Sequence, residues 1–564
     1  MKLRETGAAK PTAVGFPRPS PLEWVCLAGG LFLTIHYAWF LDDAFVYFRY
    51  ADNLLHLGRG LVFNAGEYVE GFSSPLWMLL LIVLRWTGLN FWIITRLVGA
   101  ISFAAFWFLL VTLNRRLSPR DGAVLNLPLC YLSFTYGVSC YFTSGLESPL
   151  VQVAAPLYAM FVLRPNTKWL QLLLAATPLL RHEFAVPLAM CLIWAWARNR
   201  RLPWLMTITG ISITGSWVLF RIYYYADLFP NTFYLKDTVD FSQGLVYLQD
   251  TGGTYWLWPL LIALMVMTVF VLIRPPKKPV EQATSRGRNK RKRKQKRRRS
   301  DRTEATVRSR RQESGAAVPQ PFGARHWPLE LDARLMMIAL ALSITLYVTK
   351  IGGDPRHYRY LAFPFCLMIC SCSGIVEHVL RRFSAGRLRF TAMLLGLCII
   401  TRTVTFYPQQ LMNHPFGGMD GIENLPTPEF MKIRHNYYRK VNKIADAGAH
   451  RHNPTLAQPA WGLSENIEMK DRYREFRQQH PVTDHVGVAD RSSWCAYMYR
   501  RFDLRFVHSL GLTDPVLARV DVPPDRPAHK EGLFPLAGDI GAILRKSGNA
   551  PHRGMFQEKV DTGA

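Results

Sequence analysis

Residues 22–41, with the sequence LEWVCLAGGLFLTIHYAWFL, form an apolar run of the length that a helix needs to cross about 30 Å of hydrocarbon. Similar runs follow at residues 94–113, 203–220, 255–273, 331–349 and 389–400. A soluble protein of 564 residues would divide into several domains and would not need such runs. The sequence therefore predicts a mostly α-helical, multi-pass protein of the cell membrane. The first run lacks a small-residue cleavage site, so we expect it to be retained as a helix.

Two stretches depart from simple crossings. Residues 75–90 are apolar but short, which favours a partial helix at the membrane interface. Residues 168–180 and 183–197 are interrupted by the sequence Arg181-His182-Glu183. Charges at a helix break are costly in a membrane unless they line a cavity, so this break indicates a site. With these assignments, and with basic loops kept on one side, we expect about eleven crossings.

The positive charge indicates the orientation of the helices. The net charge is +28 at pH 7, and much of it lies in residues 286–300, RGRNKRKRKQKRRRS. Lys and Arg accumulate in cytoplasmic loops, and residues 114–120, 198–201 and 381–389 are also basic. We therefore expect a cytoplasmic N-terminus and an extracytoplasmic C-terminal domain. A nucleic-acid-binding protein would carry a basic surface on its fold, so membrane lipids, and no nucleic acid, are the expected partners of the basic loop.

These signals predict five regions. They are a cytoplasmic tail (1–21), an N-terminal transmembrane region (22–274) with a first outer loop (42–74), which the motifs described below make the candidate catalytic loop, a basic cytoplasmic loop (275–330), C-terminal transmembrane helices (331–406) and an extracytoplasmic α/β domain (407–564).

The strongest chemical signal lies in residues 41–77, LDDAFVYFRYADNLLHLGRGLVFNAGEYVEGFSSPLW. Asp42 and Asp43 follow the first apolar run directly, and apolar residues after them recur at helical spacing, which predicts an amphipathic helix on the membrane surface. A carboxylate at headgroup level can deprotonate a hydroxyl, hold a sugar or bind a cation. Alternatively, the acidic pair only stabilises the start of a helix, where Asp is favoured.

Further cationic or titratable groups lie near the expected outer helix ends. They are Arg181, His182, Glu183, Arg221, Lys236, Arg356, His357 and Arg359. A lipid-phosphate donor needs such cations to hold its phosphate and to stabilise the leaving group. Tyr223, Tyr224, Tyr225 and Tyr234 suit either sugar stacking or an interfacial aromatic belt.

Metal ligation is not predicted from the cysteines. Cys366, Cys370 and Cys372 have a suggestive spacing, but they lie in an apolar helix where packing is the better interpretation. No cofactor is assigned. A divalent cation at Asp42 and Asp43 stays open as an alternative, although two adjacent Asp residues alone make a poor site.

Six motifs in this order resemble one family along nearly the whole chain. They are the segment 42–77 quoted above, TSGLESPL (143–150), LLRHEF (179–184), YYYADLFPNTFYLK (223–236), GGDPRHYRYL (352–361) and LGLTDPVLAR (510–519). Together they resemble the bacterial terminal arabinofuranosyltransferases that use decaprenyl-phosphoryl arabinose (AftB-like). They also resemble related proteins described as flagellar motor control proteins (ZomB-like).

The resemblance implies a GT-C type helical transmembrane domain with a catalytic acidic pair, which maps onto Asp42 and Asp43. The residues that it places around the donor and acceptor are Arg49, Glu147, Arg181, Glu183, Asn231, Lys236, Asp354 and Arg359. Glu70, Arg221 and His357 complete the candidate substrate-binding residues. Two features depart from the family pattern, namely the basic block 286–300 and His182, which stands where a proline is usual.

The leading hypothesis is a membrane glycosyltransferase that moves a sugar, arabinofuranosyl by the resemblance, from a polyprenyl-phosphate donor to a cell-envelope glycan at the outer face. The same fold acting on another sugar or on a protein acceptor is one alternative. A transporter is a second, although no repeat is visible and the charges gather at one membrane face. A non-catalytic accessory protein, as in flagellar motor control, is a third.

Overall fold

The computed structural model describes residues 19–36, 38, 41–118, 125–235, 241–273, 330–353 and 358–380, together with two strands at 486–489 and 505–508. As predicted, the membrane-embedded part is built from helices, and the chain is a polytopic membrane protein. The basic loop, residues 381–389 and 389–400, and most of the C-terminal domain lie outside the described residues.

The first half of the helical region contains nine short or long helices up to the charged break. They are α1 (Pro21–His36), α2 (Asp42–Leu55), α3 (Pro75–Trp86), α4 (Phe91–Leu117), α5 (Leu127–Leu132), α6 (Tyr136–Tyr141), α7 (Ser148–Leu163), α8 (Lys168–Ala175) and the 3₁₀ turn η1 (Thr177–Leu179). Polar caps set several of the starts: the Ser74 hydroxyl accepts a bond from Trp77 N at 3.4 Å before α3, and the Asn90 side chain accepts one from Ile93 N at 2.9 Å before α4.

The second half continues after the break. Its elements are η2 (His182–Phe184), α9 (Ala185–Asn199), α10 (Trp204–Tyr225), α11 (Asn231–Leu235), α12 (Phe241–Thr254), α13 (Leu257–Ile273), α16 (Leu331–Lys350), η4 (Arg359–Leu361), α17 (Ala362–Ser371) and α18 (Ile375–Leu380). In the C-terminal region, β1 (Val486–Ala489) pairs in parallel with β2 (Arg505–His508). This pair is the described part of the predicted α/β domain.

Four helical segments of the described residues are long and apolar enough to cross a membrane: 91–117, 204–225, 331–350 and 359–379. The bent pair α12 and α13, with an angle of 71°, makes a fifth if it counts as one span. This is fewer than the roughly eleven crossings expected from charge and hydropathy. The difference arises in part because α1 and α7 are shorter apolar helices, and because the segment 389–400 lies outside the described residues.

Two of the finer expectations for helices are confirmed. The stretch 75–90 forms the 12-residue helix α3, which is too short to span. The stretch 168–197 breaks into α8 and α9, with two 3₁₀ turns between them. The second turn, η2, contains His182 and Glu183, and Arg181 directly precedes it. Each of these turns holds three residues, so the regular α-helix is interrupted directly at the charged side chains.

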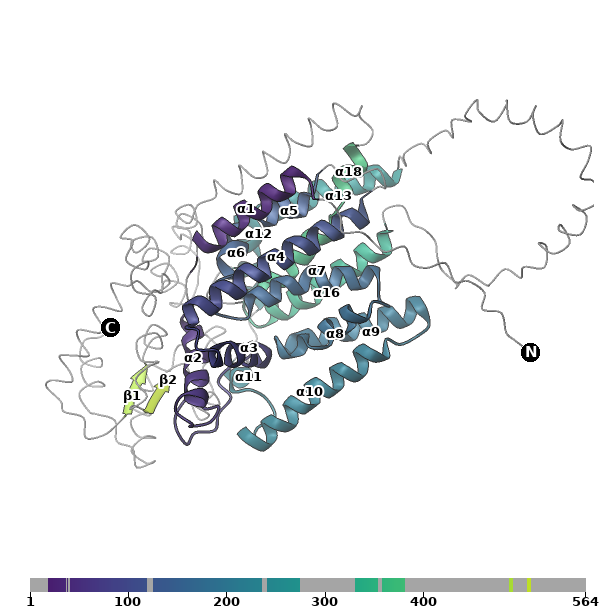
Figure 1. The fold of residues 1–564 in the computed structure, drawn as a ribbon. Helices are drawn as coiled ribbons and strands as arrows, with labels where there is room; N and C mark the ends of the chain where they lie inside the picture. Colours follow the sequence, from purple (N-terminus) through teal and green to yellow (C-terminus); the bar gives the residue numbers. More distant parts are fainter. Residues whose placement is uncertain are drawn as a thin grey trace, which may run out of the picture.

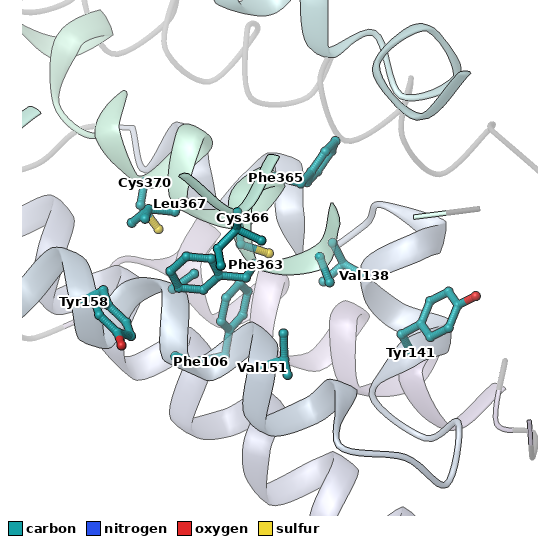
Figure 2. Close-up of a cluster of buried hydrophobic side chains, with 14 of the residues drawn as sticks. Phe106, Val138, Tyr141, Val151, Tyr158, Phe363, Phe365, Cys366, Leu367 and Cys370 are labelled. Carbon is teal, nitrogen blue, oxygen red and sulfur yellow. The ribbon is translucent and has the colours of Figure 1, made fainter. Parts of the chain in front are cut away.

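The core is centred on α17, which packs against α7 and α16. In Figure 2, Phe363, Cys366 and Leu367 of this helix lie close to Phe106 of α4 and Val151 of α7. Cys366, Cys370 and Cys372 are buried among these apolar side chains, as the packing interpretation predicts. Helix α4 also approaches the end of α6 closely: a Cβ at Gly99 would lie 2.3 Å from the carbonyl oxygen of Phe142, the residue after α6, so a side chain at this position would push the two apart.

The long helices run side by side, and α2 lies across one end of them beside α3 (Figure 1). This end, here called the site end, is where α2 and α7 begin, the α8–α9 break lies and α16 ends. Backbone N–H of Leu41 donates to Ser144 O at 2.8 Å, and the His182 ring contacts the Tyr347 hydroxyl at 3.0 Å. At the opposite end, here called the far end, α1 begins and α4 finishes, joined by an ion pair of 2.5 Å between Glu23 and Arg115.

Candidate functional site

Helix α2 carries the acidic pair to the site end. Leu41, which is buried, precedes the helix, and Asp42 and Asp43 are its first and second residues. Both residues lie in the first turn of α2, where the helix dipole favours acidic residues, so the helix-start interpretation describes their position correctly. It does not exclude a chemical role, because Asp43 also contacts a distant part of the chain.

Asp43 forms an ion pair with Arg359, which lies 316 residues further along. The Nη1 of Arg359 donates to Oδ2 of Asp43 at 2.9 Å. The Arg359 side chain is 7 % exposed, whereas that of Asp43 keeps 27 % of its surface exposed. The carboxylate is therefore fixed by a buried cation and remains reachable from outside the protein.

Arg181 and Glu183 form a second ion pair in the break between α8 and α9. The Nε of Arg181 lies 2.5 Å from Oε1 of Glu183, and its guanidinium stacks 4.2 Å from the ring centre of Tyr360. Arg359 faces the same ring at 5.5 Å. Burial acts to lower the pKa of Arg181, but Glu183, Tyr360 and Glu147 more than offset it, so the pKa is raised and the guanidinium stays charged.

Glu147 adds a third carboxylate to this cluster. It is 2 % exposed and lies directly before α7, yet its side chain does not cap the helix. Its charge acts on Arg181 and on Tyr47 of α2. Burial, and then the charge of Glu147, raise the pKa of the Tyr47 hydroxyl, which keeps that group protonated.

The loop after α2 is fixed by Arg49, which the resemblance placed in the substrate cavity, and by Tyr50, which the sequence did not single out. Arg49 donates from Nε to Phe63 O at 2.8 Å and lies 4.9 Å from the Phe63 ring centre. Tyr50 donates to Val69 O at 2.5 Å and accepts from Gly71 N at 2.9 Å. The described contacts of Arg49 thus go to the loop backbone, and they hold the first outer loop against α2.

Glu70 and Arg221 form a buried pair between this loop and α10. Arg221 donates to both Glu70 oxygens, Nη2 to Oε1 at 3.2 Å, and Trp217 Nε1 donates to Oε1 at 3.1 Å. Burial raises the pKa of the Glu70 carboxyl, while the bonds from Arg221 and Trp217 act in the opposite direction. The backbone N–H of Asn231 donates to Glu70 O at 2.9 Å. These candidate residues therefore connect the loop to α10 and α11.

The three tyrosines at the end of α10 differ in role, and sugar stacking or an interfacial aromatic belt does not describe all of them. Tyr224 accepts from Leu61 N at 2.8 Å, and Tyr225 donates to Leu61 O at 2.8 Å. Tyr223 is 89 % exposed, which suits an interfacial position. Two of the three tyrosines thus hold the outer loop, a contact between residues about 160 positions apart that no local pattern reveals.

The structure sorts the predicted site residues into two groups. Asp43, Glu147, Arg181, Glu183 and Arg359 come together at the site end, here called the site cluster. A separate group fixes the loop: Arg49, Glu70, Arg221 and Asn231. The Asp42 side chain, Lys236, Asp354, Arg356 and His357 lie outside the described residues, as do Asp514 and Arg519.

Two aromatic residues beside the site cluster were missed by sequence reasoning. Tyr47 and Tyr360 lie inside the motifs 42–77 and 352–361, but their neighbours carried the charges. For Tyr47 a signal exists, because it follows Asp43 by four residues and so shares its helix face. Among the residues that the structure describes, no group of three or more His, Cys, Asp or Glu side chains has the geometry for a metal ion.

Fold and site together define a class: a polytopic membrane protein in which three carboxylates and two arginines gather at one end of its helical bundle. The comparisons agree with this class. The chain is 31 % identical over 259 residues to a Mycobacterium tuberculosis protein named terminal beta-(1->2)-arabinofuranosyltransferase, covering 41 % of each chain. It is 24 % identical over 395 residues to the Corynebacterium glutamicum protein of the same name, covering 61 % of this chain and 49 % of that one.

The chain thus spans less than half the length of either curated relative that it matches. No family model matches the chain. No solved structure matches it.

Proposed function

We propose that this protein is a membrane glycosyltransferase of the GT-C type that moves an arabinofuranosyl unit from a polyprenyl-phosphate donor to a cell-envelope glycan at the outer face. The transferase activity and the sugar are supported by the two relatives named as arabinofuranosyltransferases. The observation that carries the proposal is the ion pair of Asp43 and Arg359, since it holds a partly exposed carboxylate beside buried cations at one end of a membrane bundle.

The two kinds of charge have different tasks in such a transfer. The donor carries a phosphate that becomes the leaving group. Arg181 and Arg359, whose guanidinium groups both face the Tyr360 ring, are the described cations that would stabilise this phosphate. Asp42 and Asp43 activate the acceptor hydroxyl or stabilise positive charge on the sugar ring. Lys236, Arg356 and His357 are further candidates for the phosphate.

The distribution of basic residues supports the outer-face location. Arg115, Arg116, Arg198, Arg200 and Arg201 lie at the ends of α4 and α9, away from the site cluster. Lys and Arg mark the cytoplasmic side, so the site end faces outward. A lipid-phosphate donor would enter there with its phosphate at headgroup level and its chain in the hydrocarbon.

The test is transfer by the purified protein in detergent from a synthetic short-chain polyprenyl-phosphoryl arabinose to an arabinoside acceptor. We expect a disaccharide product with wild type and none above background with Asp42→Asn or Asp43→Asn. Asp332→Asn, an exposed acid at the far end, is the matched control and should retain wild-type turnover.

Failure of wild type with this donor is followed by a panel of other lipid-phosphate sugars. Product from another donor would keep the reaction class and correct the sugar. No product from any donor, with folded protein, would contradict the transferase function and favour the accessory-protein alternative.

A further inference from the structure

Glu147 is a buried carboxylate with an oxygen that its surroundings leave open. It is 2 % exposed, and Oε2 makes no hydrogen bond with any residue that the structure describes. Although Glu147 precedes α7 directly, its side chain does not accept a bond from the first N–H groups of that helix. Burying an ionised carboxylate without donors is costly. The open oxygen therefore indicates that a donor comes from a bound molecule.

The position of Glu147 ties it to the site cluster. The hydrogen bond from Leu41 N to Ser144 O joins the start of α2 to the turn before α7. Asp43 follows Leu41 by two residues, and Glu147 follows Ser144 by three. Glu147 also acts electrostatically on Tyr47, one helical turn after Asp43, and on Arg181 across the break. It therefore shares one site with Asp43 and Arg359.

The charge balance of the site cluster supports a reactive role. Three carboxylates, those of Asp43, Glu147 and Glu183, face two guanidinium groups. Each guanidinium already has an ion-pair partner: Arg359 with Asp43 and Arg181 with Glu183. Glu147 forms no ion pair with either guanidinium, and its buried Oε2 receives no hydrogen bond from the described residues, so this carboxylate can accept a bond from a hydroxyl group that reaches it.

Building on the proposed transferase function, we propose that Glu147 is the base that takes the proton of the acceptor hydroxyl. As the acceptor oxygen bonds to C1 of the sugar, its proton passes to Oε2 of Glu147. The bond from C1 to the phosphate oxygen breaks, and its electron pair leaves with the polyprenyl phosphate. Asp43, held by Arg359, stabilises positive charge on the ring instead of taking the proton.

The test measures kcat against pH for full-length protein in detergent with the short-chain donor and arabinoside acceptor. Glu147→Gln keeps the shape of the side chain but cannot take a proton, so kcat should fall about 10²- to 10⁴-fold and the acidic limb of the pH profile should disappear. KM for the donor should stay within about twofold of the wild-type value, because the variant loses a proton acceptor and no contact that holds the donor in the ground state. Glu23→Gln, a matched buried acid at the far end, should keep the wild-type profile.

Two results would overturn the proposal. One is a Glu147→Gln enzyme whose pH profile keeps the acidic limb. The other is a variant that yields less folded protein but has an unchanged kcat per folded molecule. Where Glu147→Gln does not fold, Glu147→Asp decides. If Glu147 is the base, Glu147→Asp shortens the side chain by one methylene, so kcat falls while the acidic limb of the pH profile remains. If Glu147 is only structural, Glu147→Asp changes thermal stability and leaves kcat unaltered.

A second readout separates this proposal from the proposed function, because it needs no turnover. An infrared difference spectrum is recorded on adding the acceptor glycoside to wild type and to Glu147→Gln. A carboxylate band that shifts in wild type and is missing in the variant supports hydroxyl binding at Glu147, even if the donor class is wrong. Identical spectra for the two proteins would contradict it.

Discussion

Glu23 at the far end and Glu147 at the site end are both buried glutamates at the start of a helix, and their surroundings differ. Both oxygens of Glu23 are occupied: Oε2 accepts from Ser20 N at 2.7 Å and Arg115 Nη2 at 2.5 Å, and Oε1 accepts from Asn126 Nδ2 at 3.2 Å. Glu147 keeps Oε2 without a bond from the described residues. Burial alone therefore does not distinguish the two acids, whereas their hydrogen bonding and their neighbours do.

The same contrast extends to the arginines. Arg334 at the far end bonds to the carbonyl oxygens of Ser371 and Ser373, the latter at 2.7 Å, and so closes the end of α17. Arg359 and Arg181 at the site end pair with carboxylates and stack on one tyrosine ring. The far-end charges terminate helices, and the site-end charges form a partly accessible cluster.

Among the basic residues, removing Arg359 should have the largest effect on activity. In Arg359→Leu the Asp43 carboxylate loses its buried partner, and a cation for the leaving phosphate is lost as well. We expect kcat to fall about 10³-fold, within the range for one electrostatic group at a reacting centre. The comparison is Arg334→Met, which should lower thermal stability but leave kcat of the folded fraction within about twofold of wild type. Equal losses of kcat in both variants would erase the distinction between the two ends.

Breaking the pair of Glu70 and Arg221 should have the largest effect on stability. Glu70→Gln leaves a buried guanidinium without its counter-charge, which costs about 3–5 kcal/mol. Thermal unfolding in detergent, or loss of the monodisperse fraction on heating, measures this.

The double variant Glu70→Leu/Arg221→Met removes both charges and should recover much of the loss. An unfolding temperature as low as that of the single variant would mean that the pair does more than connect the loop to α10.

Neutralising Glu23 should cost less. Glu23→Gln weakens the bond to Arg115 but keeps a side-chain carbonyl oxygen, so we expect about 1–3 kcal/mol of destabilisation. Turnover per folded molecule should be unchanged. A transfer defect that persists after correction for folded protein would show that the far end takes part in the chemistry.

The exposed pair of Arg198 and Asp332 should have the smallest effect. Their side chains are 38 % and 40 % exposed, so solvent screens the 2.5 Å ion pair. Arg198→Ala should change stability by less than about 1 kcal/mol, and less still at high salt. Thermal unfolding at two salt concentrations checks this, and a larger or salt-independent loss would indicate a buried role for Arg198.

The sequence predicted those features that depend on local pattern. The apolar runs indicated the long helices, and the charged tripeptide 181–183 indicated the break between α8 and α9, because three polar residues cannot continue an apolar helix cheaply. The resemblance to a known family brought together Asp43, Glu147, Arg181, Glu183 and Arg359, which are scattered over more than 300 residues.

Side-chain partners could not be predicted in this way. Glu70 and Arg221 are 151 residues apart, and nothing in either local sequence states that they meet. Tyr224 and Tyr225 were interpreted by their place at a membrane face, but their hydroxyls satisfy the backbone of Leu61. A polar group in a membrane protein must find a partner, and only the folded chain shows which one it finds.

The most direct test compares single-turnover transfer from the short-chain polyprenyl-phosphoryl arabinose by wild type, Asp43→Asn and Glu23→Gln at equal folded concentration. We expect product from wild type and Glu23→Gln at similar rates, and a rate at least about 10³-fold lower for Asp43→Asn. Equal rates for wild type and Asp43→Asn would contradict the assignment of the chemistry to the site end.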